Sequence, residues 1–170
     1  MLNKLKPTQY LLVAGGALVF IFGLLRWFSW DLKQDDVVIQ KGQKANAFDY
    51  LFTGVVPWIL VAGVALVTIL LAVGALNPGK VPWPLVTLAA TVLGAILIII
   101  RLAMGPGVDA EDGVSVDSSR GIGLWVSALG AILAAVGAFL TYQSASFDSN
   151  TTLSSGVRPQ RDPELPPTAS

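Results

Sequence analysis

The chain has 170 residues, of which 54% are hydrophobic and 13% charged, and its 11 basic and 11 acidic residues cancel. Soluble domains carry about a quarter charged residues, so the balance indicates a membrane protein, and a neutral chain has no bulk field that would attract nucleic acid. The sequence contains neither cysteine nor histidine. This excludes disulfides and thiol chemistry, removes the commonest general base and metal ligand, and weighs against an enzyme.

The first predicted element is a membrane-spanning helix at about 10–29. Residues 10–25 carry no charge, and a bilayer core of about 30 Å needs about 20 helical residues. The run reaches that length if Arg26 extends to the headgroups and the tryptophans beyond it lie at the interface. A cleaved signal peptide is the alternative, but bulky residues from Arg26 to Phe28 stand where a cleavage site needs small ones.

A polar loop is predicted next, at about 30–52. Val37–Ile39 inside it could form a short strand, although an isolated hairpin of this size is marginal. Asn46 with Asp49 three residues later is typical of a capped helix start, in which the acidic residue also suits the helix dipole.

The stretch after this cap predicts a proline-bent start of a second span at about 53–76. Gly54 eases bending, and Pro57 inside a helix would leave a carbonyl unbonded and kink the rod. One continuous tilted helix is the alternative. We expect any functional surface to lie where Asp49, Gly54 and Pro57 meet the preceding polar loop.

Two further apolar runs complete a predicted membrane domain at 1–143. The predicted spans are at about 10–29, 53–76, 83–102 and 121–142, with extramembrane loops at about 30–52 and 103–120. Residues 144–170 are rich in serine, threonine and proline, so we expect a disordered tail. Arginines and tryptophans near the span ends are the expected interface anchors: Arg26, Trp27, Trp30, Trp83, Arg101 and Trp125.

The fourth span carries small residues at helical spacing, which let helix backbones approach closely in lipid. These residues are Gly123, Ser127, Gly130, Ala131, Ala134, Ala135 and Ala138. They predict a packing surface, either toward a second copy or another membrane protein or, as the favoured alternative, within the four-helix unit itself.

Few residues offer chemistry. The deep polar positions are hydroxyls, which in helices usually bond their own backbone: Thr68, Thr87, Thr91 and Ser127. The absence of an ionisable residue in mid-span argues against proton-coupled transport but leaves a simple pore open. The acidic cluster Asp109, Glu111 and Asp112 lacks the ligand spacing of a calcium loop. We predict no catalytic residue, no metal site and no cofactor.

Three stretches carry a resemblance to a known family: NAFDYLFTGVVPWIL, PWPLVTLAATVLGAILIIIRL and SSRGIGLWVSALGAILAAVGAFLTYQ. They resemble a family of uncharacterised four-span integral membrane proteins of actinobacteria, over roughly residues 10–143. The resemblance implies four spans in the cytoplasmic membrane and supplies no catalytic residue.

The sequence therefore predicts an all-α four-transmembrane-helix bundle in the plasma membrane. Both termini are expected to be cytoplasmic, because the lysines before the first span weigh most and no acid accompanies them. The expected partners are the lipid bilayer and, through the fourth span, the chain itself or another membrane protein; no nucleic acid is expected. The expected function is a non-enzymatic scaffold or accessory subunit of a membrane complex.

Two alternatives remain open. One is a passive channel or carrier for a small or lipophilic solute, with the four deep hydroxyls along its path. The other is a lipid-modifying membrane enzyme, whose only candidate residues would be polar groups near the surface: Asp31, Asp35, Asp36, Asp49 and Arg101.

Overall fold

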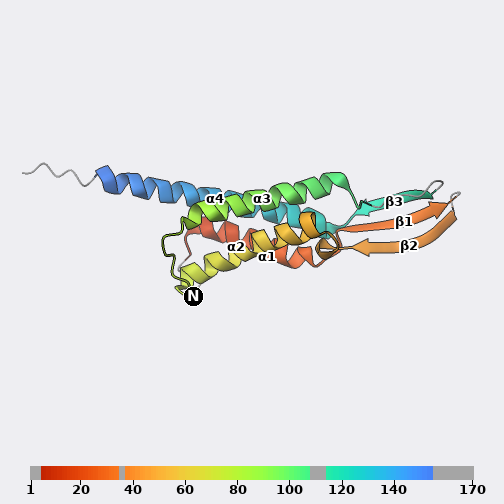
Figure 1. The fold of residues 1–170 in the computed structure, drawn as a ribbon, viewed down its shortest axis with the longest axis horizontal. Coiled ribbons are helices and arrows are strands. Elements are labelled where there is room, and N and C mark those ends of the chain that lie inside the picture. Colours follow the sequence, from red (N-terminus) through yellow and green to blue (C-terminus); the bar gives the residue numbers. More distant parts are fainter. Residues whose placement is uncertain (1–4, 35–36, 108–113, 155–170) are drawn as a thin grey trace, which may run out of the picture.

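Four helices lie side by side, and a small sheet extends from one end of them in this computed structural model (Figure 1). The structure describes residues 5–34, 37–107 and 114–154. It is 68% helical. The helices are α1 (Pro7–Gly23), α2 (Val56–Val73), α3 (Trp83–Met104) and α4 (Ile122–Ser154), and the strands are β1 (Phe28–Gln34), β2 (Val37–Ala45) and β3 (Val114–Arg120).

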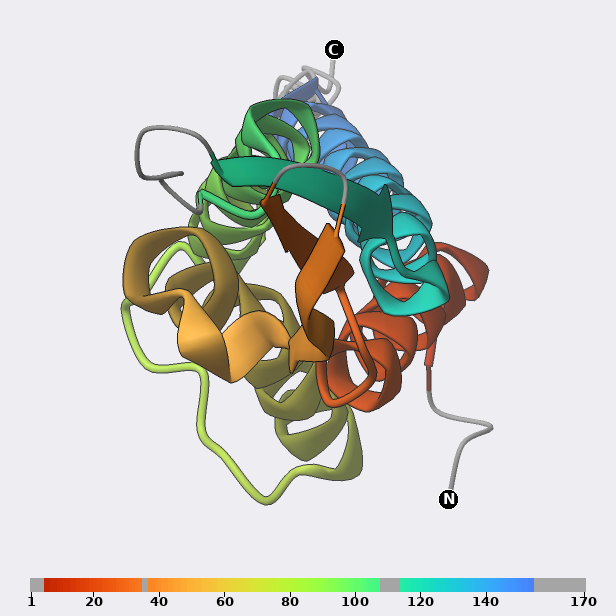
Figure 2. The same cartoon turned by 90° about the vertical axis from the view of Figure 1, so that its right-hand side faces the viewer.

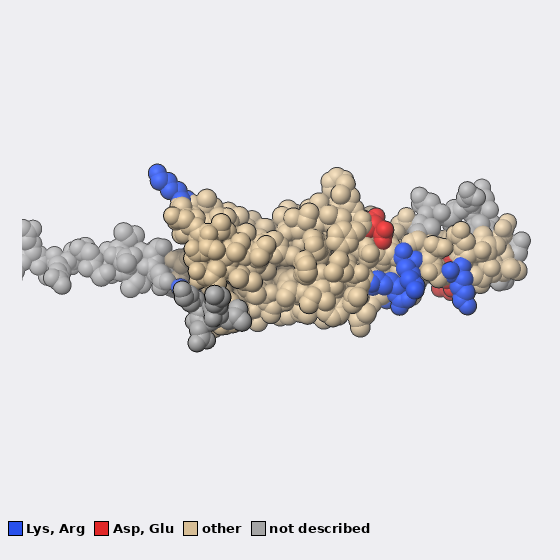
Figure 3. All heavy atoms as spheres, turned by 90° about the horizontal axis from the view of Figure 1, so that it is seen from below, with Lys and Arg blue, Asp and Glu red and all other residues tan. Residues whose placement is uncertain are grey.

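Three helical segments are long and apolar enough to cross a membrane, namely Leu51–Val73, Trp83–Met104 and Ile122–Ser146. The fourth, α1, has 17 residues, or about 26 Å at 1.5 Å per residue, slightly less than a bilayer core. Figure 3 shows charged side chains near both ends of the visible face and none across its middle. These features support a membrane-embedded protein.

The predicted helical fold is confirmed in part: the structure is mostly helical, but both predicted polar loops contribute strands, so it is not all-α. Seen from the sheet end, the four helices form a ring behind the strands, whose order is β2-β1-β3 (Figure 2). Both strand pairs are antiparallel, with Phe28 opposite Ala45 on one side and opposite Arg120 on the other. A lone β1–β2 hairpin would be marginal, but β3 arrives from the loop after α3 and makes a three-stranded sheet.

The hairpin contains a bulge that its own sequence supports. The register slips between Trp30 and Leu32, and Gly42 has φ 74°, a conformation that glycine adopts without strain. The Gly42 N–H donates to Asp31 Oδ1 at 2.6 Å. The carboxylate thus replaces the ladder partner that the bulge removes.

Two predicted boundaries also differ from those in the structure. The first helix ends at Gly23 rather than near residue 29, because Phe28 already belongs to β1. The last helix continues to Ser154, into the predicted tail at 144–170. The remainder of that predicted tail lies outside the described residues.

The helices pack as a ring in which α1 contacts α2 and α4, and α3 contacts the same two helices. A core of buried residues, including Val19, Val61, Ile98 and Leu124, runs between them. It reaches the base of the sheet, where Phe28 is fully buried. The sheet is therefore anchored on the bundle core rather than tethered by a flexible loop.

Candidate interaction surface

Arg101 lies at the junction between the helices and the sheet. Its side chain is only 6% exposed, and its guanidinium carbon lies 3.4 Å from the Tyr50 ring centroid and 5.2 Å from that of Phe28. Its Nη2 donates to the Pro106 carbonyl at 2.7 Å, as does the Tyr50 hydroxyl at 3.2 Å. Arg101 is therefore not the exposed interface anchor that its position at the end of an apolar run predicted.

Trp27 also differs from the predicted interface anchor. It is 1% exposed, and its indole Nε1 donates to the Phe22 carbonyl at 3.2 Å. Its backbone N–H donates to Ala45 and its carbonyl accepts from Gly121. Trp27 thus ties the end of α1 to β2 and to the start of α4, and it cannot face lipid headgroups.

The other expected anchors lie in varied positions. Arg26 and Trp125 are exposed, as an interface residue requires. Trp30 is half-buried against the core on β1. Trp83 is half-buried and donates from Nε1 to the Pro78 carbonyl at 2.9 Å at the far end of the bundle.

The predicted cap at Asn46 is confirmed, although it starts a single 3-10 turn, Ala47–Asp49. Asn46 Oδ1 accepts from the Phe48 N–H at 2.8 Å, and the exposed Asp49 returns the bond by accepting from the Asn46 N–H at 2.7 Å. These reciprocal bonds fix how the chain passes from the sheet to α2.

The expected elbow between Gly54 and Pro57 is a π-helical turn, Leu51–Val55. The Val55 N–H donates five residues back, to the Tyr50 carbonyl at 2.9 Å. The buried Pro57 follows in the first turn of α2, where its missing N–H does no harm. Gly54 is buried against the Ala47 backbone, a closeness that a Cβ would prevent.

The small residues of the fourth span pack inside the chain. Gly130 lies against the Gly15 carbonyl of α1, and Gly123 lies against the Phe22 and Arg26 carbonyls. The set is buried except for the half-buried Ala135: Gly123, Ser127, Gly130, Ala131, Ala134 and Ala138. Of the two alternatives for this surface, the contacts correspond to packing within the four-helix unit.

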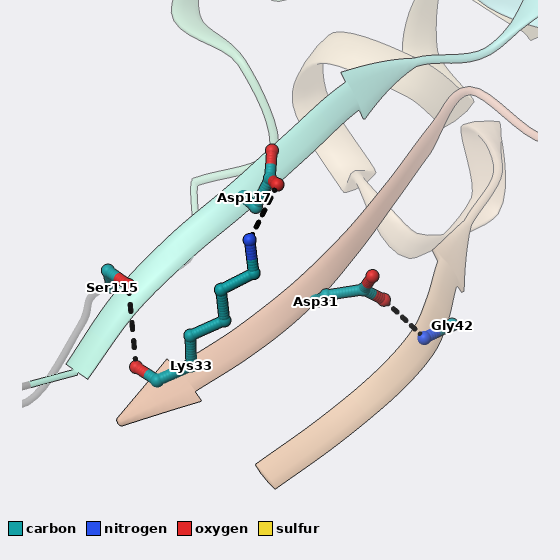
Figure 4. Close-up of polar contacts among 5 residues, drawn as sticks. All are labelled: Asp31, Lys33, Gly42, Ser115 and Asp117. Carbon is teal, nitrogen blue, oxygen red and sulfur yellow. Dashed lines mark hydrogen bonds and ion pairs between the residues drawn. The ribbon is translucent and has the colours of Figure 1, made fainter. Parts of the chain in front are cut away.

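The sheet presents two unlike faces, and β1 alternates between them. On one face Ser29 bonds Ser119 at 2.8 Å between hydroxyl oxygens, and Lys33 Nζ lies 3.1 Å from Asp117 Oδ2. Figure 4 shows the Lys33–Asp117 pair bridging β1 and β3, and Asp31 reaching toward Gly42. These side chains of β1 and β3 form a polar cluster that is joined by its own contacts.

The opposite face of the sheet carries apolar residues of β1 and β3 beside polar residues of β2. Trp30 and Leu32 point to it from β1, and Val116 is the cross-strand partner of Leu32. Leu32 and Val116 are only half-buried, and Figure 1 shows the sheet extending beyond the helix ends. We call Trp30, Leu32 and Val116, with Gln40 and Gln43 of β2 beside them, the apolar sheet face.

Three of the four hydroxyls expected along a channel bond the backbone of their own helices. Thr68 donates to the Val64 carbonyl, Thr87 to that of Pro84 and Thr91 to that of Thr87, each within its own helix. Ser127 Oγ is buried and has no hydrogen-bond partner among the described residues.

Thr68 and Thr87 line a cavity of about 80 Å³ with Thr141. Asp31 and Asp49 are each engaged with a nearby backbone N–H rather than with one another. Asp35 and Asp36 lie outside the described residues. Within the described ranges no group of three or more acidic residues could hold a metal ion.

Sequence reasoning missed the apolar sheet face, although its pattern was present. Phe28, Trp30 and Leu32 alternate with polar residues in the order expected for a half-buried strand. A scan against models of known protein families finds no match, and a search of curated proteins finds no similar sequence.

Proposed function

We propose that this chain is a non-enzymatic multi-pass membrane protein that acts as a scaffold or accessory subunit, and that the apolar sheet face binds its protein partner. The support is a rigid sheet that projects from the bundle and leaves Leu32 and Val116 half-exposed. An apolar patch on a projecting element is typical of an interaction surface.

The foundation of the sheet supports this proposal. Trp27, Phe28 and Arg101 are buried at its base, so the strands are held in a fixed orientation relative to the helices. A pre-ordered surface loses little conformational entropy on binding. The small residues of α4 are covered by α1, so the sheet rather than α4 is the proposed partner surface.

We further propose that all four helices cross the plasma membrane, with both termini in the cytoplasm. α1 begins and α4 ends at the end of the bundle away from the sheet (Figure 1). This arrangement would put the sheet outside. Cysteine labelling tests the orientation without interference from other thiols, because the chain has none. If Lys44→Cys reacts with a membrane-impermeant thiol reagent in intact cells, the result supports the proposed orientation. If it reacts only after lysis, the result contradicts that orientation.

In-cell photo-crosslinking tests the partner surface. A photo-reactive residue at Gln40 lies on the apolar sheet face, whereas one at Lys44, opposite Ser29, lies on the polar face of the same strand. We expect a defined protein adduct from Gln40 and much less from Lys44. Recovery of the chain alone from both positions would contradict the proposal.

A matched pair of substitutions completes this test. Leu32→Glu adds a charge to the apolar sheet face, and Val38→Glu makes a similar change on the other face, beside Lys33. We expect Leu32→Glu to remove the adduct and Val38→Glu to keep it. Thermal unfolding of both variants in detergent separates loss of binding from loss of fold.

A further inference from the structure

An apolar groove runs between α1 and α2 on the outside of the bundle. It has a volume of about 550 Å³. Its lining is formed by small residues at the floor and aromatic residues at one end, chiefly Gly16, Ala17, Phe20, Trp58, Ala62 and Gly63. No charged residue contributes to it.

Two glycines shape the groove. Gly16 lies against Ala65, so α1 and α2 approach closely at the floor. A Cβ added at Gly63 would meet nothing within 4 Å, so this position faces open space. The only polar side-chain group in the lining, Trp58 Nε1, already donates to the Phe20 carbonyl at 3.1 Å. An occupant therefore needs apolar surface and no hydrogen bonds.

The groove begins at the sheet end of the helices. Phe20 stacks on Trp58 with ring centroids 5.1 Å apart, and Phe48 makes an edge-on contact with Trp58 at a centroid distance of 5.2 Å. Aromatic side chains are enriched at the membrane–water interface. From there the lining extends to Val13 on α1 and to Ile69 on α2. At 1.5 Å per residue the lining spans about 12 Å from Ile21 to Val13 on α1 and about 17 Å from Trp58 to Ile69 on α2. One leaflet contributes about 15 Å of hydrocarbon.

The volume suits an occupant of the size of one acyl chain. If a methylene takes up about as much space as a water molecule, about 30 Å³, the groove holds about 18 of them. That is one acyl chain of ordinary length.

We infer that this groove binds one acyl chain of a membrane lipid from the sheet-side leaflet. Lipid tails and leucine side chains are similarly apolar, so the preference comes from packing into a hollow rather than from the hydrophobic effect. The inference requires the helices to lie in a bilayer. It does not require a protein partner on the sheet.

The test uses the full chain in vesicles that contain a phospholipid with a diazirine in a 16-carbon acyl chain. After irradiation, peptide mass spectrometry locates the adducts. We expect them to concentrate on the α1 and α2 walls, several-fold above the exposed outer side of α3. Gly63→Leu and Ala17→Leu fill the groove and should reduce this labelling several-fold. Ala89→Leu, on an exposed position of α3, should leave it unchanged.

Three results would overturn the inference. Labelling spread evenly over all exposed helix surfaces would show no preference. If Gly63→Leu leaves both the labelling and the thermal unfolding unchanged, the acyl chain must bind elsewhere. Labelling of the α1 and α2 walls below that of the outer side of α3 would show that something other than lipid, such as a second copy, occupies the groove. If the protein does not co-float with the vesicles in a density gradient, the membrane location itself is refuted. A failed crosslink from the sheet would contradict only the proposed partner surface.

Discussion

Replacing Arg101 with methionine tests whether the buried guanidinium secures the sheet to the bundle. The change keeps a long side chain but removes the cation that lies 3.4 Å from the Tyr50 ring centroid. A desolvated cation–π contact contributes about 2 kcal/mol, and a charged hydrogen bond such as that to Pro106 contributes about 1.5–3 kcal/mol. Burying the charge costs several kcal/mol in the opposite direction. The two contacts together contribute about 3.5–5 kcal/mol, so a burial cost of about 2–3 kcal/mol leaves a net loss of about 2 kcal/mol on substitution.

The assay is unfolding in mild-detergent micelles by a titrated denaturing detergent, followed by tryptophan fluorescence. Trp27 and Trp30 lie near the sheet base and report its loss. Arg26→Met makes the same chemical change at an exposed arginine and should stay within about 0.5 kcal/mol of the original chain.

A double-mutant cycle between Arg101→Met and Tyr50→Leu should give a coupling of about 1–2 kcal/mol. If Arg101→Met is as stable as the original chain or more stable, the cost of burying the charge exceeds its contacts. The reasoning would then be refuted.

Two other substitutions probe the helix ring and the start of α2. Gly15→Ala places a Cβ against the Gly130 carbonyl and the Ala134 backbone, so we expect a loss of about 1–3 kcal/mol in the same titration. Gly63→Ala, whose Cβ meets open space, should be neutral or stabilising by up to about 1 kcal/mol. Equal losses of stability for Gly15→Ala and Gly63→Ala would contradict the close packing of α1 on α4. Asn46→Ala removes the cap and should cost about 1 kcal/mol, whereas Asn46→Asp should retain most of it; faster amide exchange at Phe48 checks the local effect.

The helical part of the fold could be predicted because hydrophobicity and length are local properties of the chain. Asn46 and Asp49 were recognisable for the same reason, since a cap is contained within four residues. The sheet could not be predicted with equal ease. β1 follows an apolar helix so closely that Trp27, Phe28 and Trp30 are consistent with the end of a span, and β3 pairs with a strand more than 80 residues earlier.

The candidate surfaces depended still more on tertiary context. Arg101 at the end of an apolar run is consistent with an anchor, and only the arrival of Phe28 and Tyr50 from other elements buries it. The small residues of α4 permit close packing but do not specify the partner. The matching Gly15 on α1 selects an internal contact. The groove between α1 and α2 arises from two helices together and has no signature in either one alone.

The pairing of β1 with β3 also has a consequence for the order of assembly during synthesis. The contact between Ser29 and Ser119 closes a loop of 90 residues, and that loop contains the whole of α2 and α3. Contacts of such separation form late, because the intervening chain must first be ordered. The β1–β2 hairpin is therefore synthesised early, but the sheet is completed last. The free edge of β1 stays unpaired until α3 has been placed and β3 has returned to the same end of the bundle. Completion of the sheet can thus occur only after α2 and α3 have brought the chain back to the end of the bundle at which β1 lies.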